Sequence, residues 1–339
     1  MRHISDKALT RLRNSAALPD LSGTRYRLLG QVARGGMGTV YAAQDEPLQR
    51  RVALKVLEVP GSEGELANRL MREARVLARL EHPGIVPVHD VGTLADGRVF
   101  YTMKFVEGQR LDKYIESLAS IPDRLRILLR ICDAVAFAHM RGVLHRDLKP
   151  ANVMVGSFGE VLVMDWGLAK ILADAPETEA CNPAAAILHS PGNRQKDATV
   201  SGITGHGRVM GTQGYMSPEQ ARGEIESLDA RSDIFSLGAL LRFLLSDKLP
   251  LRSPARPYRS LEAICAKACE QKREGRYATV QELAMDISRY LEGLAVAAHR
   301  ESIFEKLGRS YRRYRFFIFL IAAYLLTRVI LLLVFKHGR

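Results

Sequence analysis

His145-Arg146-Asp147-Leu148-Lys149-Pro150-Ala151-Asn152 is the stretch of this sequence that decides the fold. It follows an amphipathic helical pattern over residues 123–140 and precedes a short β-type run that begins at Val153. A carboxylate, an ammonium group and an amide lie within six residues, so one loop can present all three. A single loop aspartate is more often a cap of local backbone N–H groups. The motifs on either side must decide between these interpretations.

Two further motifs follow along the chain. Asp165-Trp166-Gly167 begins 13 residues after Asn152 and directly after the apolar run at 161–164. Residues 211–219 have the sequence GTQGYMSPE, and Asp233 lies farther on in RSDIFSLG. The side chains of Asn152 and Asp165 offer oxygen ligands, which suit a hard divalent cation.

Three elements precede the octapeptide. Gly35-Gly36-Met37-Gly38 lies between two β-type runs, Lys55 lies in the apolar strand pattern VALKV, and Glu73 lies on a helical pattern over residues 63–80. Each has an ordinary explanation, namely a turn, a strand-edge lysine and a solvated glutamate. Together they form a loop that covers phosphates, a lysine that binds them and a glutamate that holds the lysine.

In this order and spacing the motifs resemble the Hanks-type serine/threonine protein kinases of bacteria, over about residues 26–292. The resemblance implies an α+β fold with a β-rich N-lobe at 26–106 and a helical C-lobe at 107–292. It also implies transfer of the γ-phosphoryl group of ATP to protein serine and threonine hydroxyls, including the chain's own, with Mg²⁺ or in its place Mn²⁺. The alternative is a pseudokinase, a membrane-tethered scaffold that binds nucleotide without efficient transfer.

The resemblance assigns catalytic or metal-binding roles to seven residues. Asp147 would orient the substrate hydroxyl, Lys149 would reach the γ-phosphate, and Thr212 would support both. Lys55 would hold the α- and β-phosphates, and Glu73 would hold Lys55. Asn152 and Asp165 would be the metal ligands.

The same resemblance predicts the nucleotide pocket. Gly35, Gly36 and Gly38 would cover the phosphates, and Met103 would be the gatekeeper beside the adenine. The remaining pocket residues would sandwich the base or form the hinge: Val40, Ala53, Met154, Lys104, Phe105 and Val106.

Several residues depart from the family pattern. Ala33 replaces the first glycine of the loop, and Trp166 replaces the usual phenylalanine. The segment from Asp165 to Glu219 is long, and we expect phosphorylation of at least one of Thr199, Ser201 and Thr204, docked on Arg146. Residues 246–260 are short for a substrate-docking helix. Glu219 is expected to pair with Arg276.

Charge and composition exclude several other classes. The 339 residues carry a formal net charge of +12, of which +6 lies in residues 301–339 and +3 in residues 1–25. A nucleic-acid partner is therefore not expected, because its basic stripe would cross the folded body. With 47% hydrophobic residues and four cysteines, the chain is neither disordered nor a disulfide scaffold.

The C-terminal region predicts a membrane anchor. Residues 316–335 form an apolar run long enough for about 30 Å of helix, and basic residues in 293–315 precede it. A buried helix is the alternative, but only Thr327 and Arg328 interrupt the run. The positive-inside rule then predicts a single-pass protein of the cytoplasmic membrane, with a cytoplasmic kinase domain, a four-residue tail at 336–339 and the bilayer as a partner. A homodimer is a further candidate assembly.

Overall fold

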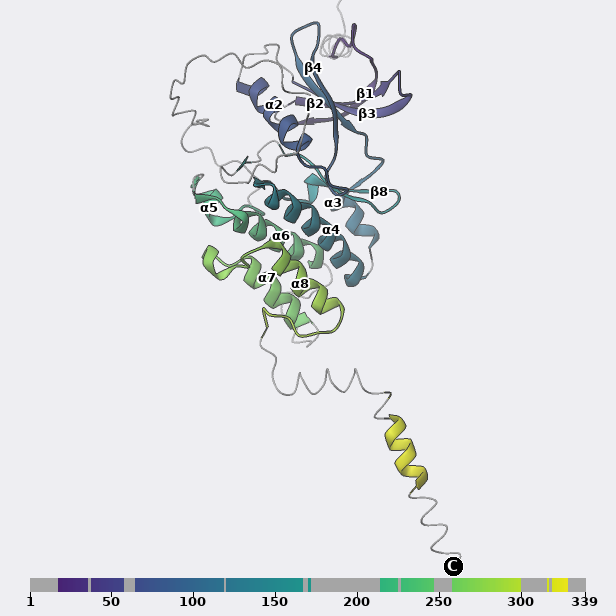
Figure 1. The fold of residues 1–339 in the computed structure, drawn as a ribbon, viewed down its shortest axis with the longest axis vertical. Coiled ribbons are helices and arrows are strands. Elements are labelled where there is room, and N and C mark those ends of the chain that lie inside the picture. Colours follow the sequence, from purple (N-terminus) through teal and green to yellow (C-terminus); the bar gives the residue numbers. More distant parts are fainter. Residues whose placement is uncertain are drawn as a thin grey trace, which may run out of the picture.

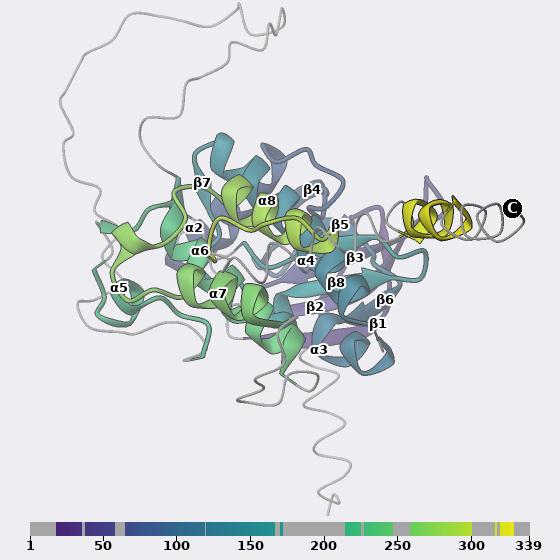
Figure 2. The ribbon, with the colours of Figure 1, turned by 90° about the horizontal axis from the view of Figure 1, so that it is seen from below.

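Two lobes lie one above the other in the computed structural model (Figure 1). It describes residues 18–35, 38–57, 65–118, 120–166, 170–171, 214–224, 227–246, 258–299, 316 and 319–328. The predicted division into a β-rich lobe and a helical lobe is confirmed. Seen from below, the helices of the second lobe are nearer the viewer than the purple strands of the first lobe (Figure 2).

The first lobe is an antiparallel sheet of five strands in the order β1-β2-β3-β5-β4. Its strands are β1 (Tyr26–Gly35), β2 (Gly38–Asp45), β3 (Arg50–Val56), β4 (Val88–Thr93) and β5 (Val99–Lys104). From Thr39 onward, alternate side chains of β2 are buried, as expected when one face of the sheet is more closely packed than the other.

Helix α2 (Glu65–Ala78) contacts β4 and β5 of this sheet. It buries Leu70, Ala74 and Leu77, whose spacing of three and four residues forms one stripe of the helix. The predicted helical pattern extended to Leu80, which is buried but lies beyond the end of the helix.

The second lobe consists mainly of helices. They are α3 (Leu111–Tyr114), α4 (Ile121–Met140), α5 (Pro218–Ala221), α6 (Ala230–Leu245), α7 (Arg259–Ala268) and α8 (Val280–Leu291). The hydroxyl of Ser120 caps α4 by accepting from the Asp123 backbone N–H at 3.2 Å, so the helix begins two residues earlier than predicted. Helix α4 packs against both α6 and α8 and carries ten buried side chains, which places it at the centre of the lobe.

The remaining elements are short strands and 3₁₀ turns. The strands are β6 (Gly108–Arg110), β7 (Val143–Leu144), β8 (Val153–Gly156), β9 (Val161–Val163) and β10 (Lys170–Ile171). The turns are η1 (Ile115–Ser117), η2 (Pro150–Asn152) and η5 (Arg273–Gly275). A single hydrophobic cluster runs from Ala53 in β3 through Val106 to Leu128 in α4, so the lobes share one core.

Residues at both ends of the body pack onto it. Leu21 joins the cluster on the first-lobe sheet, and Val296 joins the main core next to α8. Farther on, residues 319–328 are helical, and this stretch appears in yellow in Figure 1. Within the described part of the chain, no helix combines the length and apolar character needed to cross a membrane.

Candidate active site

Asp147 lies at the centre of the loop between β7 and β8, as part of one hydrogen-bonded cluster. Lys149 Nζ donates to Asp147 Oδ2 at 2.7 Å, and Asn152 Nδ2 donates to the same oxygen at 3.0 Å. Asn152 Nδ2 also lies 2.9 Å from the Asp147 carbonyl. One carboxylate oxygen therefore binds both neighbours, and among the described residues no hydrogen bond involves Asp147 Oδ1.

Asp233 on α6 binds the backbone of this loop. Its Oδ1 accepts from the Arg146 backbone N–H at 2.8 Å, and its Oδ2 accepts from the His145 N–H at 2.9 Å and lies 2.7 Å from His139 Nε2. Burial alone would raise the pKa of Asp233, but the hydrogen bond from His139 and the donors around it lower the pKa below its usual value. Arg146 has a φ of 69°, so these bonds fix a residue in an uncommon backbone conformation.

Lys55 and Glu73 form a buried ion pair between β3 and α2. Lys55 Nζ lies 2.8 Å and 2.9 Å from the two Glu73 carboxylate oxygens, and 3.5 Å from Asp165 Oδ1. Burial alone would lower the pKa of Lys55, but the two carboxylates outweigh burial and raise its pKa above the usual value. The lysine is therefore charged near neutral pH and available to phosphate oxygens.

Asp165 and Trp166 follow β9 and face different environments. The Asp165 side chain is 49% exposed and its backbone has a φ of 59°, whereas Trp166 is 1% exposed. The Trp166 indole N–H donates to the Val163 carbonyl at 3.3 Å, and its ring lies 4.5 Å from that of His145. The tryptophan thus fills an apolar slot with its polar group satisfied.

The predicted pocket residues that the structure describes lie at the junction of the lobes. Ala53 pairs with Met103 in the β3–β5 ladder, and Val40 pairs with Lys55 in the β2–β3 ladder. Met154 pairs with Arg110 from the second lobe. Ala53, Met103 and Val106 belong to the main core, with Val40, Phe105 and Met154 packed against it.

The glycine-rich loop is described only in part. Gly35 and Gly38 end β1 and begin β2 as ladder partners, while Gly36 lies outside the described residues. A Cβ at Gly38 would lie 2.3 Å from the Val56 carbonyl oxygen, and its φ is 150°, so this position requires glycine. Ala33 pairs with Val40, so its methyl group is compatible with the strand.

Asn152 and Asp165 fit a divalent cation. Both offer oxygen donors, and Asn152 uses only its Nδ2 in the hydrogen bonds among the described residues, which leaves its Oδ1 free. Met164, which precedes Asp165, donates its backbone N–H to the Asn152 carbonyl at 2.8 Å. This bond holds the two predicted ligands in adjacent segments.

The end of the long segment is anchored in the second lobe. Arg276 donates to both Glu219 oxygens, at 2.7 Å and 2.9 Å, so the predicted pair is present and buried. Thr212 and the three candidate phosphorylation sites Thr199, Ser201 and Thr204 lie outside the described residues.

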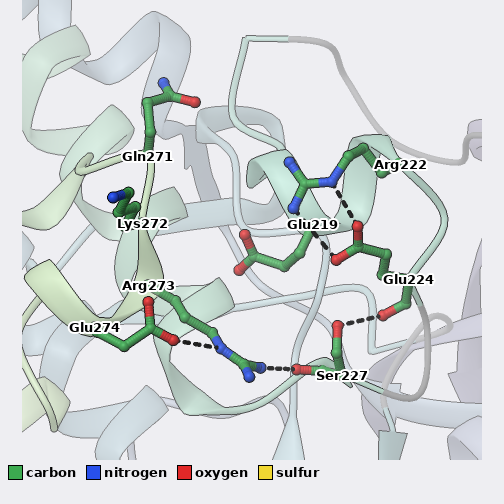
Figure 3. A pocket seen from close by; sticks show the side chains of 8 residues that line it. All are labelled: Glu219, Arg222, Glu224, Ser227, Gln271, Lys272, Arg273 and Glu274. Carbon is green, nitrogen blue, oxygen red and sulfur yellow. Dashed lines mark hydrogen bonds and ion pairs between the residues drawn. The ribbon is translucent and has the colours of Figure 1, made fainter.

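A hollow of about 410 Å³ lies beside Glu219, between α5 and η5 (Figure 3). Its acidic side chains are already paired with arginine: Glu224 with Arg222 at 2.6 Å and Glu274 with Arg273 at 3.1 Å. None of the residues that line this hollow belongs to the predicted nucleotide pocket, so it is a separate feature of the second lobe.

Sequence reasoning missed three residues of the site. They are Tyr101, which binds Glu73, His139, which binds Asp233, and Gln220, which binds the Arg146 carbonyl. None lies in a motif that was singled out, and their spacing along the chain carries no signal. Tyr101 lies two residues before the predicted gatekeeper Met103 in an ordinary strand pattern, and only the folded chain brings it to Glu73.

A family model of the protein kinase domain matches residues 26–295. The chain belongs to the protein kinase family, as the motifs indicated. It is 36% identical over 321 residues to the serine/threonine-protein kinase PknD of Protochlamydia amoebophila (strain UWE25), covering 82% of this chain and 31% of that protein. It is also 36% identical over 325 residues to the PknD of Chlamydia muridarum (strain MoPn / Nigg), covering 86% of this chain and 34% of that one.

The chain thus spans about a third of the length of the curated relatives it matches. Among solved structures, the PknI kinase domain of Mycobacterium tuberculosis is similar, with a TM-score of 0.54 and 24% identity. The match covers 78% of this chain and 96% of that domain. This likeness supports the two-lobed fold.

Proposed function

We propose that this chain transfers the γ-phosphoryl group of ATP, with Mg²⁺, to serine and threonine hydroxyls of proteins and of its own chain. The observation that carries the proposal is the joint presence of two arrangements. Lys55 is bound to Glu73 at 2.8 Å beside Asp165, and Asp147 is bound to Lys149 at 2.7 Å. A nucleotide-binding scaffold needs the first arrangement and has no use for the second.

The catalytic loop suits the orientation of a hydroxyl group. Asp147 Oδ2 binds Lys149 and Asn152, which fixes the carboxylate plane and leaves Oδ1 to accept the hydroxyl proton. Lys149, on the same loop, supplies positive charge where negative charge moves during transfer. Bound Mg²⁺ would neutralise charge on the phosphate oxygens.

Phosphate mapping tests this function. The full-length chain, in detergent, is incubated with Mg-ATP and its phosphorylated residues are mapped by mass spectrometry, with Asp147→Asn as the matched variant. We expect phosphate on serine and threonine in the wild type, none on Asp147→Asn, and none when EDTA removes the metal. Equal phosphorylation of both proteins would contradict the proposal.

The pseudokinase alternative has a different outcome in the same experiment. It predicts that the chain binds ATP, as measured by calorimetry, while neither protein gains phosphate. Mn²⁺ in place of Mg²⁺ is included, because some phosphotransferase sites accept either ion.

We further propose that residues 316–335 anchor the chain in the cytoplasmic membrane, with the kinase domain in the cytoplasm of a bacterial cell. The described part of this run exposes large apolar side chains, with Phe319 at 74%, Tyr324 at 63% and Leu326 at 62%. The Thr327 hydroxyl donates to the Ala323 carbonyl at 2.9 Å, which satisfies a polar group within its own helix. Such a surface is stable in lipid or against a partner helix.

Protease protection of membrane vesicles tests the anchor. We expect the kinase domain to sediment with membranes, to resist protease in right-side-out cells and to be digested in inverted vesicles. Deletion of residues 316–335 should release it. A wild-type domain that stays in the soluble fraction would contradict the anchor, and cross-linking in the membrane would test the homodimer.

A further inference from the structure

Tyr101 places its hydroxyl group on the glutamate of the buried ion pair. Its Oη donates to Glu73 Oε1 at 2.9 Å, the same oxygen that Lys55 Nζ approaches at 2.8 Å. Tyr101 is 1% exposed and Glu73 is 2% exposed, so water does not compete for this bond. The Glu73 carboxylate therefore has two protein donors, one charged and one neutral.

The strand register places this tyrosine opposite the lysine. Lys55 of β3 and Tyr101 of β5 are direct partners in the antiparallel ladder, so their side chains project from the same face of the sheet. Lys55 Nζ lies 5.7 Å from the centre of the Tyr101 ring. Both side chains reach the same carboxylate on α2 from a rigid sheet.

Lys55 and the Tyr101 hydroxyl, the two donors to Glu73, differ in what else they can bind during the reaction. Lys55 also lies 3.5 Å from Asp165, and a bound nucleotide would draw it toward phosphate oxygens. The Tyr101 hydroxyl faces only protein, and burial together with the Glu73 charge raises its pKa well above its usual value. It therefore stays protonated and keeps donating to Glu73 while the lysine is shared.

We propose that Tyr101 is a positioning residue for phosphoryl transfer, whose hydroxyl holds Glu73 and helix α2 against β5 so that Lys55 stays aimed at the nucleotide. The inference rests on the proposed kinase function. The Tyr101 hydroxyl would then keep α2 in the position that phosphoryl transfer requires even when Lys55 is drawn toward the nucleotide. The ordinary alternative is that Glu73 merely satisfies a buried hydroxyl, with no consequence for the position of the helix.

Tyr101→Phe removes the hydroxyl and keeps the ring. Tyr41→Phe is the matched control, since Tyr41 is a 5% exposed tyrosine of β2 whose hydroxyl bonds to none of the described residues. We expect Tyr101→Phe to lower kcat/KM for ATP roughly tenfold, as for loss of a hydrogen bond to a charged group. Most of the loss should appear as a higher KM, and Tyr41→Phe should match the wild type.

A double-mutant cycle with Glu73→Ala, which removes the acceptor, separates positioning from general packing. If Tyr101 acts through Glu73, then Tyr101→Phe should change kcat/KM less than twofold in the Glu73→Ala background. Equal fold-losses in both backgrounds, or a loss below twofold in the wild-type background, would overturn the proposal. Thermal melts of all variants identify any effect that is only a loss of folded protein.

Hydrogen exchange gives a readout that does not depend on activity. Amides of α2 (Glu65–Ala78) should exchange faster in Tyr101→Phe than in Tyr41→Phe, while those of α4 should be unchanged. Unchanged exchange in α2 would overturn the proposal even if activity fell. If the wild type transfers no phosphate, the proposed function fails, and α2 exchange still decides whether Tyr101 holds the helix.

Discussion

Gln220 Nε2 donates a hydrogen bond to the backbone carbonyl of Arg146 at 2.8 Å. Gln220 lies on α5, directly after the Ser217-Pro218-Glu219 motif, and its Oε1 accepts from the Ser217 backbone N–H at 3.1 Å. Arg146 has a φ of 69°, and Asp233 binds its N–H on the other side. One amide side chain thus joins the anchored end of the long segment to the loop that carries Asp147.

Gln220→Glu should separate the two functions of this side chain. Glutamate keeps the oxygen that caps α5 but cannot donate to the Arg146 carbonyl. We expect kcat to fall by roughly three- to tenfold, as for one lost hydrogen bond, with little change in Tm. Steady-state kinetics and thermal melts measure both quantities. If kcat is unchanged, the catalytic loop does not depend on this bond.

The Glu219–Arg276 pair should make stability depend on acid pH. Burial alone would raise the pKa of Glu219, but the bonds from Arg276 outweigh burial and lower its pKa to about 2. The stabilisation is therefore complete above the ordinary pKa near 4.5 and is lost as pH falls toward 2. As pH falls from 4.5 to about 2, urea melts should show that protonation of Glu219 lowers the free energy of unfolding by on the order of 3 kcal/mol.

Arg276→Met should remove that dependence, because it leaves the buried Glu219 carboxylate without its cationic partner, with only the Ser232 hydroxyl as a side-chain donor. We expect the free energy of unfolding of Arg276→Met to be about 3–5 kcal/mol below that of the wild type at neutral pH. This difference should become smaller as pH falls. Glu224→Gln is the control, since it breaks the exposed pair with Arg222 and should leave Tm nearly unchanged. If the stability difference between Arg276→Met and the wild type does not change with pH, Glu219 is not the group that makes stability depend on acid pH.

Trp166 is the only tryptophan of the chain and follows Asp165 directly. Its intrinsic fluorescence should therefore report on the predicted metal ligand. We expect Mg-ATP to change the emission intensity or maximum, and the change to titrate with the ATP affinity measured by calorimetry. Asp165→Asn should weaken the response to Mg²⁺. A spectrum that stays constant at saturating Mg-ATP would contradict this coupling.

Gly38→Ala should destabilise the first lobe, because its Cβ would lie 2.3 Å from the Val56 carbonyl oxygen. We expect the free energy of unfolding to fall by about 1–3 kcal/mol, which would be seen as a lower Tm. The KM for ATP should rise as well. Gly30→Ala is the control in the neighbouring strand, where an added Cβ meets no atom within 4 Å. Equal melts for the two variants would show that the β2–β3 approach tolerates the methyl group.

The motifs predicted the two lobes and marked Lys55, Glu73 and Asp147 as site residues. Both predictions depend only on residue types and spacings that are local in the sequence. The β-type run after the glycine-rich loop indicated β2, and the Leu70–Leu77 stripe indicated α2. Boundaries were less accurate, since α4 begins at Ile121, two residues before the predicted start of the helical pattern. Membrane insertion of residues 316–335 stays a prediction.

The sequence by itself determined the family, the order of the motifs and the chemistry of each site residue, since these depend on residue type and spacing. Tertiary structure alone decided which side chains support them. Tyr101 reaches Glu73 across 28 positions, Gln220 reaches Arg146 across 74 and His139 reaches Asp233 across 94. Such partners depend on strand register and on how helices pack, which no local pattern encodes.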